Sequence, residues 1–233
     1  MQKTRCLLQL SILCSSAVLS ANADIVTTNL LTNPGAETGS ISGWTVGGTS
    51  NPSVDNGAFD VGINPHTGSF DFYGHTGRTG TLSQIVPLIG VQGITQADVN
   101  TGDLSAIVSF WEQGLNQAAT SDDARIQLEF LGAGNADLGI VNTSTIDSHN
   151  GTWTQGTGSF LIPTGTQKIE YTMDFIRHVG TDNDSFIDDN SLVVTGARAI
   201  APVPEPDSLV LVASGAAMVG FMMFRRKRTK SGR

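Results

Sequence analysis

The stretch Lys168-Ile169-Glu170-Tyr171-Thr172-Met173-Asp174-Phe175 places an apolar side chain at every second position. Successive side chains of a β-strand point to opposite faces, so this pattern buries one face and exposes the other. The same alternation recurs in residues 125–130 and, more briefly, in residues 69–72. Strands with one buried face are typical of antiparallel sheets that pack on a single core.

Short β-rich runs separated by turn residues fill the middle of the chain. Turn signals include Asn33-Pro34-Gly35 and Gly132-Ala133-Gly134-Asn135, and no amphipathic helix of useful length occurs, although residues 92–99 have room for one turn. Strands at this spacing predict an all-β, antiparallel two-sheet jelly-roll sandwich over residues 24–197. The further strands that we expect are 82–88, 106–113, 137–143, 158–162 and 186–195.

The beginning and end of this segment resemble galactose-binding-like jelly rolls, a fold shared by many carbohydrate-binding modules. The resemblance rests on the opening stretch at residues 29–37 (NLLTNPGAE), the Gly43-Trp44 pair, an L-x-Q strand at residues 82–84, a late Trp153 and a closing strand at residues 186–192. Two positions depart from the usual pattern. Ala36 stands in place of a Phe, and Asn190 stands in place of an aliphatic residue.

The resemblance implies a structural calcium site shared by Glu37 and Asp188. The first and last strands are neighbours in such folds, and calcium prefers carboxylate and carbonyl oxygens. Asp189 is the alternative ligand, since period two places it on the opposite face from Asp188. Alternatively, Glu37 accepts from nearby backbone amides and Asp188 ends a strand in solvent. A second acidic stretch, residues 181–184, reads as an ordinary polar turn.

Exposed aromatic side chains are the candidates for contact with sugar rings. Trp111 follows Phe110 in an expected strand, so one of the two must face outward. Tyr73 and His75 lie between glycines on what we expect to be a loop. We therefore name Trp111 and Tyr73 as ligand-binding candidates, with core packing as the alternative for each.

Charge and the absence of catalytic motifs exclude several function classes. The chain carries a formal charge of −8, and residues 24–200 contain five Lys or Arg against nineteen Asp or Glu. A body this acidic repels phosphate backbones, which argues against nucleic-acid binding, and acidity also keeps an exported protein soluble. The sequence has no G-x-S-x-G or H-E-x-x-H motif. We expect Glu112, Glu129 and Glu170 to face solvent, and no enzymatic activity.

The first 23 residues have the parts of a secretory signal peptide. Lys3 and Arg5 precede an apolar run, and Ala21-Asn22-Ala23 offers the small residues that signal peptidase requires. Cleavage before Asp24 would remove both cysteines, Cys6 and Cys14, and leave a mature protein without disulfides. An uncleaved anchor helix is the alternative.

The C-terminal segment predicts a membrane anchor at residues 208–224. Residues 209–224 hold no charge, and a helix over them would span about 24 Å. This is shorter than the roughly 30 Å hydrocarbon core, and flanking side chains that snorkel to the interface make up the difference. A basic cytoplasmic tail follows at residues 225–233, and its charge predicts that the main domain lies on the far side of the inner membrane. The alternative, a buried core helix, does not fit a run with no polar face. The cluster that would stop transfer is Arg225, Arg226, Lys227 and Arg228.

A linker at residues 198–207 joins the two parts and contains Val203, Pro204, Glu205 and Pro206. This motif, the apolar run and the terminal basic cluster together resemble the PEP-CTERM sorting domain. The resemblance implies that an exosortase, a bacterial membrane enzyme, reads the tail and cuts near the Pro-Glu-Pro. Prolines keep such a site extended and accessible.

The sequence as a whole predicts an exported, non-catalytic protein of the bacterial envelope or extracellular matrix that binds carbohydrate or exopolysaccharide through a calcium-stabilised jelly roll. Two alternatives stay open. One is a polysaccharide-active hydrolase or esterase, and the other is a structural surface component with no ligand.

Overall fold

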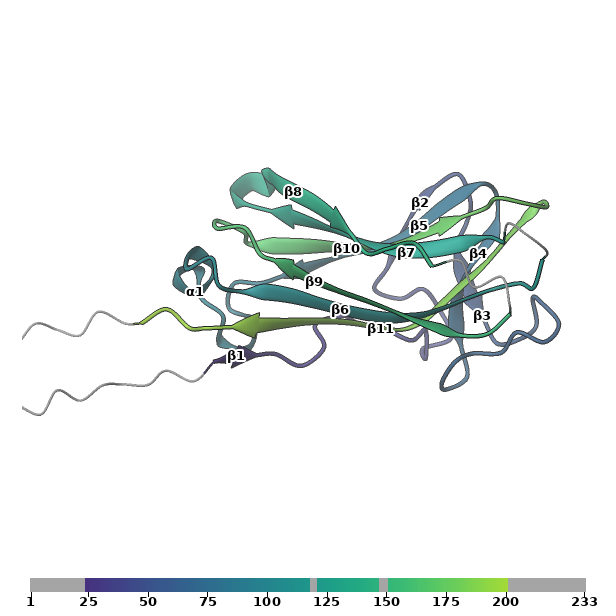
Figure 1. Ribbon diagram of the computed structural model, residues 1–233, viewed down its shortest axis with the longest axis horizontal. Helices are drawn as coiled ribbons and strands as arrows, with labels where there is room; N and C mark the ends of the chain where they lie inside the picture. The colour runs from purple at the N-terminus through teal and green to yellow at the C-terminus, as the bar shows by residue number, and fades with distance from the viewer. Residues whose placement is uncertain (1–23, 118–120, 147–150, 201–233) are drawn as a thin grey trace, which may run out of the picture. The chain divides into compact units, whose positions relative to one another are not determined.

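The computed structural model describes residues 24–117, 121–146 and 151–200, which form a sandwich of two antiparallel sheets (Figure 1). The predicted signal peptide, the Pro-Glu-Pro motif, the anchor and the basic tail lie outside the described residues. Within the described part of the chain, no helix has the length and apolarity needed to cross a membrane.

The sheet that we call sheet A contains the strand order β3-β4-β11-β6-β9, with β1 added to the side of β11. Its longest strand, β11, pairs with β4 and β6 on either side and with β1 near its end. The bounds are β1 (Ile25–Val26), β3 (Ser53–Asp55), β4 (Asp71–Thr76), β6 (Ser105–Gly114), β9 (Thr154–Leu161) and β11 (Asp182–Gly196).

The second sheet, sheet B, has the order β2-β5-β10-β7-β8, with β10 in the centre. The predicted period-two strand at residues 168–175 is this central strand. Its bounds and those of its neighbours are β2 (Thr45–Gly48), β5 (Thr79–Pro87), β7 (Asp123–Leu131), β8 (Asp137–Asn142) and β10 (Lys168–Ile176).

The core between the sheets is built from the alternate apolar residues that the sequence pattern selects. Tyr171, Met173 and Phe175 of β10 are fully buried, and Phe110 of β6 and Phe72 of β4 meet them from sheet A. Trp44, at the start of β2, packs edge-on against Phe72 and Tyr171. Both expected layers of the jelly roll are therefore present.

Among the described residues, helical structure is confined to short segments at one end of the sandwich. The α1 helix (Gln96–Asn100) begins with a reciprocal capping box between Thr95 and Asp98, and it falls where one turn of helix was expected. Two 3-10 turns, η1 (Val91–Gly93) and η2 (Ala133–Asn135), complete the set. Asp98 also accepts from the backbone N–H of Ala199, so the chain leaves the domain beside α1.

Candidate functional site

The residues predicted to carry function gather on the outer face of sheet A, the face turned away from sheet B. On this face Asp188 of β11 is the direct cross-strand partner of Trp111 in β6, and Phe186 is the partner of Tyr73 in β4. The segment at residues 56–67 packs against the same face, because Phe59 and Ile63 form a small hydrophobic cluster with Tyr73 and Phe186. We call this segment the covering loop.

Glu37 and Asp188 both hold the turn at residues 66–70, which leads from the covering loop into β4. The Glu37 carboxylate accepts from the backbone amides of Ser69 and Phe70 at 3.1 Å. Asp188 Oδ2 accepts from the amide of Thr67, also at 3.1 Å. The two predicted calcium ligands thus contact neighbouring peptide groups of one turn. No group of three or more His, Cys, Asp or Glu side chains within the described residues is arranged to hold a metal ion.

The prediction that Asp189 faces away from Asp188 is wrong. A β-bulge interrupts the pairing of β11 between Asp188 and Ser191, and Asp189 has a left-handed φ of 48°. The bulge turns its side chain to the same turn that Asp188 contacts, where its Oδ1 accepts from Thr67 Oγ1 at 2.7 Å and its Oδ2 lies 2.7 Å from His66 Nδ1. Period two fails here because a bulge adds a residue to one strand only.

Asp71 is a member of this face that sequence reasoning missed. It is fully buried, and neither carboxylate oxygen has a hydrogen-bond partner. Burial, reinforced by the nearby charges of Asp55 and Asp188, raises the pKa of Asp71 to about 8. Burial likewise raises the pKa of Asp188 to about 7. Two buried carboxylates near each other favour protons or a bound cation over free charge.

Asp55 is engaged differently from its cross-strand partner Asp71. Its carboxylate accepts from the backbone amides of Gly57, Ala58 and Phe59, so it fixes the start of the covering loop. Nothing in the amino-acid pattern of residues 53–71 distinguishes these two aspartates. Their different roles follow from the path of the loop.

The aromatic candidates have different surroundings from those expected. Phe110 faces the core and Trp111 faces outward, but the His66 ring stacks on the Trp111 indole with a 4.0 Å centroid distance. Tyr73 is buried beneath Phe59, and both Tyr73 and His75 lie on β4, so their expected place on a loop is wrong. Trp153 is half-buried, and its Nε1 donates to the carbonyl of Asn64 at 3.0 Å.

Trp153 borders a hollow of about 360 Å³ beside the covering loop. Gly62, Asn64 and Pro65 line one side, and Gln113 with residues 151–153 line the other. The Gln113 side chain donates to the carbonyl of Gly151 at 2.8 Å, which joins β6 to the approach to β9. A flat indole beside amide and backbone groups is the combination that stacks a sugar ring and hydrogen-bonds its hydroxyls.

Two further expectations about acidic residues are also wrong. Residues 182–184 start β11 instead of forming a polar turn, and Asp184 is buried, with its carboxylate accepting from Gln117 Nε2 at 2.6 Å. Burial and the charge of Asp60 raise the pKa of Asp184 to about 6. Glu112 is fully buried and does not face solvent, because it lies opposite Ile187, which packs in the core.

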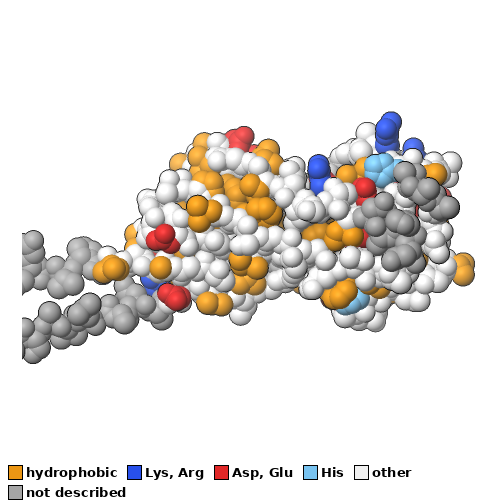
Figure 2. Space-filling view, in the orientation of Figure 1, with side chains coloured by type: hydrophobic (Ala, Val, Ile, Leu, Met, Phe, Trp, Pro, Cys, Tyr) orange, Lys and Arg blue, Asp and Glu red, His pale blue; other side chains and the backbone are white. Residues whose placement is uncertain are grey.

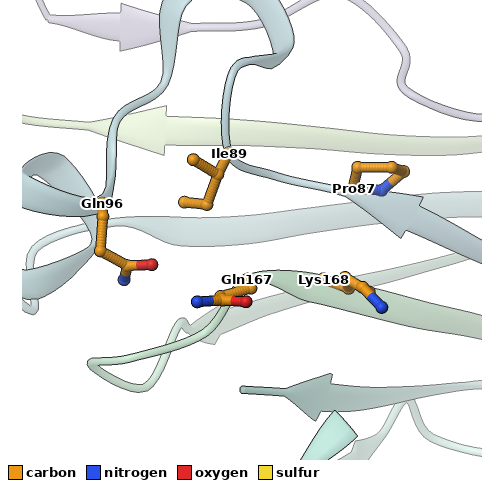
Figure 3. Close-up of a pocket in the computed structure, with 5 residues that line it drawn as sticks. All are labelled: Pro87, Ile89, Gln96, Gln167 and Lys168. Atoms are coloured by element: carbon orange, nitrogen blue, oxygen red, sulfur yellow. The ribbon is translucent and has the colours of Figure 1, made fainter. Parts of the chain in front are cut away.

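A second hollow, of about 460 Å³, lies on the α1 side of the molecule (Figure 3). Its lining comes from the end of β5, α1 and the start of β10, namely Pro87, Ile89, Gln96, Gln167 and Lys168. The Lys168 ammonium donates to Asn135 Oδ1 at 2.8 Å. None of these five lining residues is aromatic, and none comes from the face that gathers the predicted site residues.

Comparisons with known proteins test two parts of the prediction separately, namely the C-terminal tail and the fold of the domain. Residues 202–228 match the PEP-CTERM protein-sorting motif, which confirms the resemblance found in the tail. No curated protein matches the chain at a significant level.

Solved structures with a similar fold include a carbohydrate-binding module of family 61 in complex with β-1,4-galactotriose, at 24% identity and a TM-score of 0.46, covering 71% of this chain and 98% of that one. A cyclase from Fischerella sp. TAU has 13% identity and a TM-score of 0.50, covering 75% and 100%. The enzymatically active domain of tailspike protein 4 from bacteriophage CBA120 also has 13% identity and a TM-score of 0.50, covering 71% of this chain. The chain spans only 21% of that tailspike structure. The expected all-β jelly roll is confirmed.

Proposed function

We propose that this protein is exported across the inner membrane, is held by its C-terminal anchor until an exosortase cuts near Pro204-Glu205-Pro206, and binds polysaccharide in the envelope or extracellular matrix without chemical turnover. The sorting motif in the tail supports the export and anchoring steps. The observation that carries the binding role is the hollow bordered by Trp153 and lined by the covering loop.

A non-catalytic role fits the state of the carboxylates on the outer face of sheet A. Asp55 is used by three backbone amides, and Asp188 accepts two. Asp71 is fully buried on the face beneath the covering loop. General acid–base catalysis requires a carboxyl group within hydrogen-bond reach of the substrate, whereas Asp55 and Asp188 are engaged by backbone amides and Asp71 is shielded from solvent.

Calcium would brace the turn at residues 66–70 in this proposal. Carboxylate oxygens of Glu37 and Asp188 are the ligand type that calcium prefers, and the opening turn passes close by, since a Cβ on Gly35 would lie 3.1 Å from Asp188 Oδ1. The raised pKa of the buried Asp188 fits a carboxylate that gains by meeting a cation. In this proposal Glu37 and Asp188 would supply two of the ligands, and their oxygens would be shared between the ion and the backbone amides that they accept.

The binding role is tested by affinity electrophoresis of the purified full-length protein in gels containing soluble polysaccharides, among them the host's exopolysaccharide, β-1,4-galactan and xylan. Trp153→Ala should lose retention on the retained polymer by about tenfold or more, because stacking and hydrophobic contact are both removed. Leu161→Ala, an exposed apolar residue elsewhere on sheet A, is the matched control and should bind as the wild type does. Equal retention of the two variants would contradict the assignment.

The calcium ion is tested by thermal melting in EDTA and in excess calcium. Saturation at about 100 times Kd adds about 2.7 kcal/mol to the free energy of unfolding, which raises Tm by roughly 5–10 °C for a domain of this size. Asp188→Asn should abolish the rise, while Asp137→Asn, an exposed aspartate, should keep it. Terbium provides a second readout, because Trp111 lies directly opposite Asp188 and can sensitise its luminescence.

The hydrolase or esterase reading is a second candidate because Asp184 and Asp188 have pKa values raised to about 6 and about 7, as catalytic acids often do. Release of reducing ends or acyl groups from a retained polymer, lost in Asp184→Asn or Asp188→Asn, would favour it. Retention without release favours the binding role.

A further inference from the structure

Two arginines lie side by side at one end of sheet B. Arg78 directly precedes β5 and Arg177 directly follows β10, and the backbone N–H of Arg177 donates to the carbonyl of Arg78 at 2.8 Å. With His178, Val179 and Gly180 they line a hollow of about 270 Å³. This hollow, which we call the arginine pocket, is lined mainly by polar groups.

Two neighbouring arginines are unusual in a domain whose net charge is strongly negative. Residues 24–200 contain five basic residues against nineteen acidic ones, and two of the five meet here. Figure 2 shows how few Lys and Arg side chains occur on the visible face. Like charges on neighbouring strands repel each other, so a bound anion would relieve the strain that the pair imposes.

Two acidic side chains beside this pocket contact its loop and neither forms an ion pair with the two arginines. Asp122 accepts from the backbone amides of His178, Val179 and Asp184, and Asp123 Oδ2 lies 2.9 Å from His178 Nε2. The Arg78 side chain has no hydrogen bond or ion pair with the described residues, and Arg177 donates through Nη1 to the carbonyl of Thr181. Most of the N–H groups of the two guanidinium forks therefore remain available.

The arginine pocket lies at the same end of the sandwich as the hollow beside Trp153. Asp184 connects the two regions, because its amide donates to Asp122, its carbonyl accepts from Leu115, and its carboxylate accepts from Gln117. Leu115 and Gln117 follow β6, the strand that supplies Gln113 to the Trp153 hollow. The loops that line the two hollows are therefore joined through Asp184.

We propose that the arginine pocket binds an anionic group, a carboxylate or a sulfate ester, of an acidic polysaccharide. The inference rests on the proposed polysaccharide-binding function and specifies the chemical class of the polymer. Guanidinium groups bind carboxylate and sulfate oxygens through paired N–H donors. The net negative charge of the domain repels a polyanion, so binding depends on the two neighbouring arginines and weakens as salt screens them.

Three polymers with one backbone test this proposal, namely dextran, carboxymethyl-dextran and dextran sulfate. The full-length protein is compared by affinity electrophoresis with an Arg78→Gln/Arg177→Gln double variant and with Arg125→Gln. Arg125 is a matched control, because it also lies on sheet B but is paired with Asp174 at 2.9 Å. The wild type should bind one or both acidic dextrans more tightly than dextran, and the double variant should lose about tenfold or more of that affinity. Arg125→Gln should lose none.

Two outcomes would overturn the proposal. One is equal retention of the wild type and the double variant on acidic dextrans, and the other is an equal loss in Arg125→Gln, which would indicate a general charge effect. Arg78→Lys/Arg177→Lys keeps the charge but removes the planar forks, and we expect it to bind with intermediate affinity. Melting curves confirm that each variant is folded.

If Trp153→Ala still reduces retention on a neutral polymer while the arginine variants change nothing, only the acidic specificity fails. If the wild type is retained on none of the polymers, the polysaccharide-binding function fails as well.

Discussion

At the scale of single residues, Asp71 has the least favourable environment among the carboxylates of this face. It is fully buried and its two oxygens have no partners, and its pKa is raised to about 8 from an ordinary value near 4. Between these values the folded protein holds a proton that the unfolded chain has released. Linkage then requires the free energy of unfolding to fall as pH rises through this window.

Replacing Asp71 with Asn should remove much of that pH dependence. In EDTA the Tm of the wild type should fall between about pH 5 and pH 8, and the variant should fall less, because it has no charge to bury. At pH 8 we expect Asp71→Asn to be more stable than the wild type by about 2–4 kcal/mol. The measurement is thermal melting across pH, with Asp137→Asn as the exposed control. If the curves for the wild type and Asp71→Asn are parallel, the buried charge of Asp71 does not cause the pH dependence. Some slope should remain in the variant, because the pKa of Asp188 is also raised.

Gly68 shows how closely the 66–70 turn and Glu37 fit. A Cβ on Gly68 would overlap the Glu37 carboxylate, and the residue has a φ of +70°. Gly134 has a similar φ of +65° but nothing within 4 Å of its Cβ position. We expect Gly134→Ala to cost about 1 kcal/mol from backbone strain alone, and Gly68→Ala to cost about 2 kcal/mol more. Chemical denaturation measures both, and equal losses would mean that the contact with Glu37 contributes nothing.

At the scale of elements, hydrophobic alternation predicted the long strands because each buries one face against the other sheet. The expected strands at 125–130 and 168–175 lie within β7 and β10, and those at 106–113 and 186–195 lie within β6 and β11. The strands β1, β2 and β3 were missed because two to four residues are too few to show a period. The covering loop was missed for a different reason, since its apolar residues pack against a few side chains of one sheet face and leave no periodic signal.

Polar side chains join the opening turn to the closing strand, and one of them, Asn190, departs from the pattern of the resembled family. Asn190 stands where an aliphatic residue was expected, yet its Nδ2 donates to the carbonyl of Pro34 and its Oδ1 accepts from Tyr171 Oη, at 2.8 and 2.9 Å. Gln84 of β5 likewise bonds Thr32 and Gly43. Composition alone does not indicate which polar residues are buried with partners.

Restoring the aliphatic residue should therefore destabilise the protein. Asn190→Leu leaves the hydroxyl of Tyr171 without its acceptor in a buried site, while the carbonyl of Pro34 loses one donor and keeps the backbone N–H of residue 190. We expect a loss of about 1–3 kcal/mol in the free energy of unfolding. Ser191→Ala, the next position in β11 and half-buried, should lose less than about 0.5 kcal/mol. A variant with leucine at position 190 that is as stable as the wild type would show that these hydrogen bonds are not needed.

At the scale of the whole molecule, β11 separates the exit of the chain from the candidate site. Its fifteen residues extend over roughly 50 Å, from Asp182 near the arginine pocket to Gly196 near α1. The pairing of β1 with β11 brings Ile25 opposite Gly196, so the chain enters and leaves the domain at the α1 end (Figure 1). Arg198 and Ala199 bond Gly93 and Asp98 there. The hollows beside Trp153 and Arg78 lie at the other end, away from the point where the chain leaves the domain.

Inserting a small folded domain at either end tests this polarity. Gly134 and Gly180 are matched sites, because both have positive φ and open space around them, but Gly134 lies near the start of β8 on the α1 side and Gly180 borders the arginine pocket. Exposed loop tips of this kind tolerate insertions without unfolding the domain. Insertion at Gly134 should leave retention on acidic dextrans within about twofold of the wild type, while insertion at Gly180 should reduce it by about tenfold or more. The result is read by affinity electrophoresis, with melting curves as the check on folding. If both insertions reduce retention equally, the binding surface lies elsewhere on the sandwich. If neither insertion reduces retention, polymer binding does not involve the end of the domain that carries the arginine pocket.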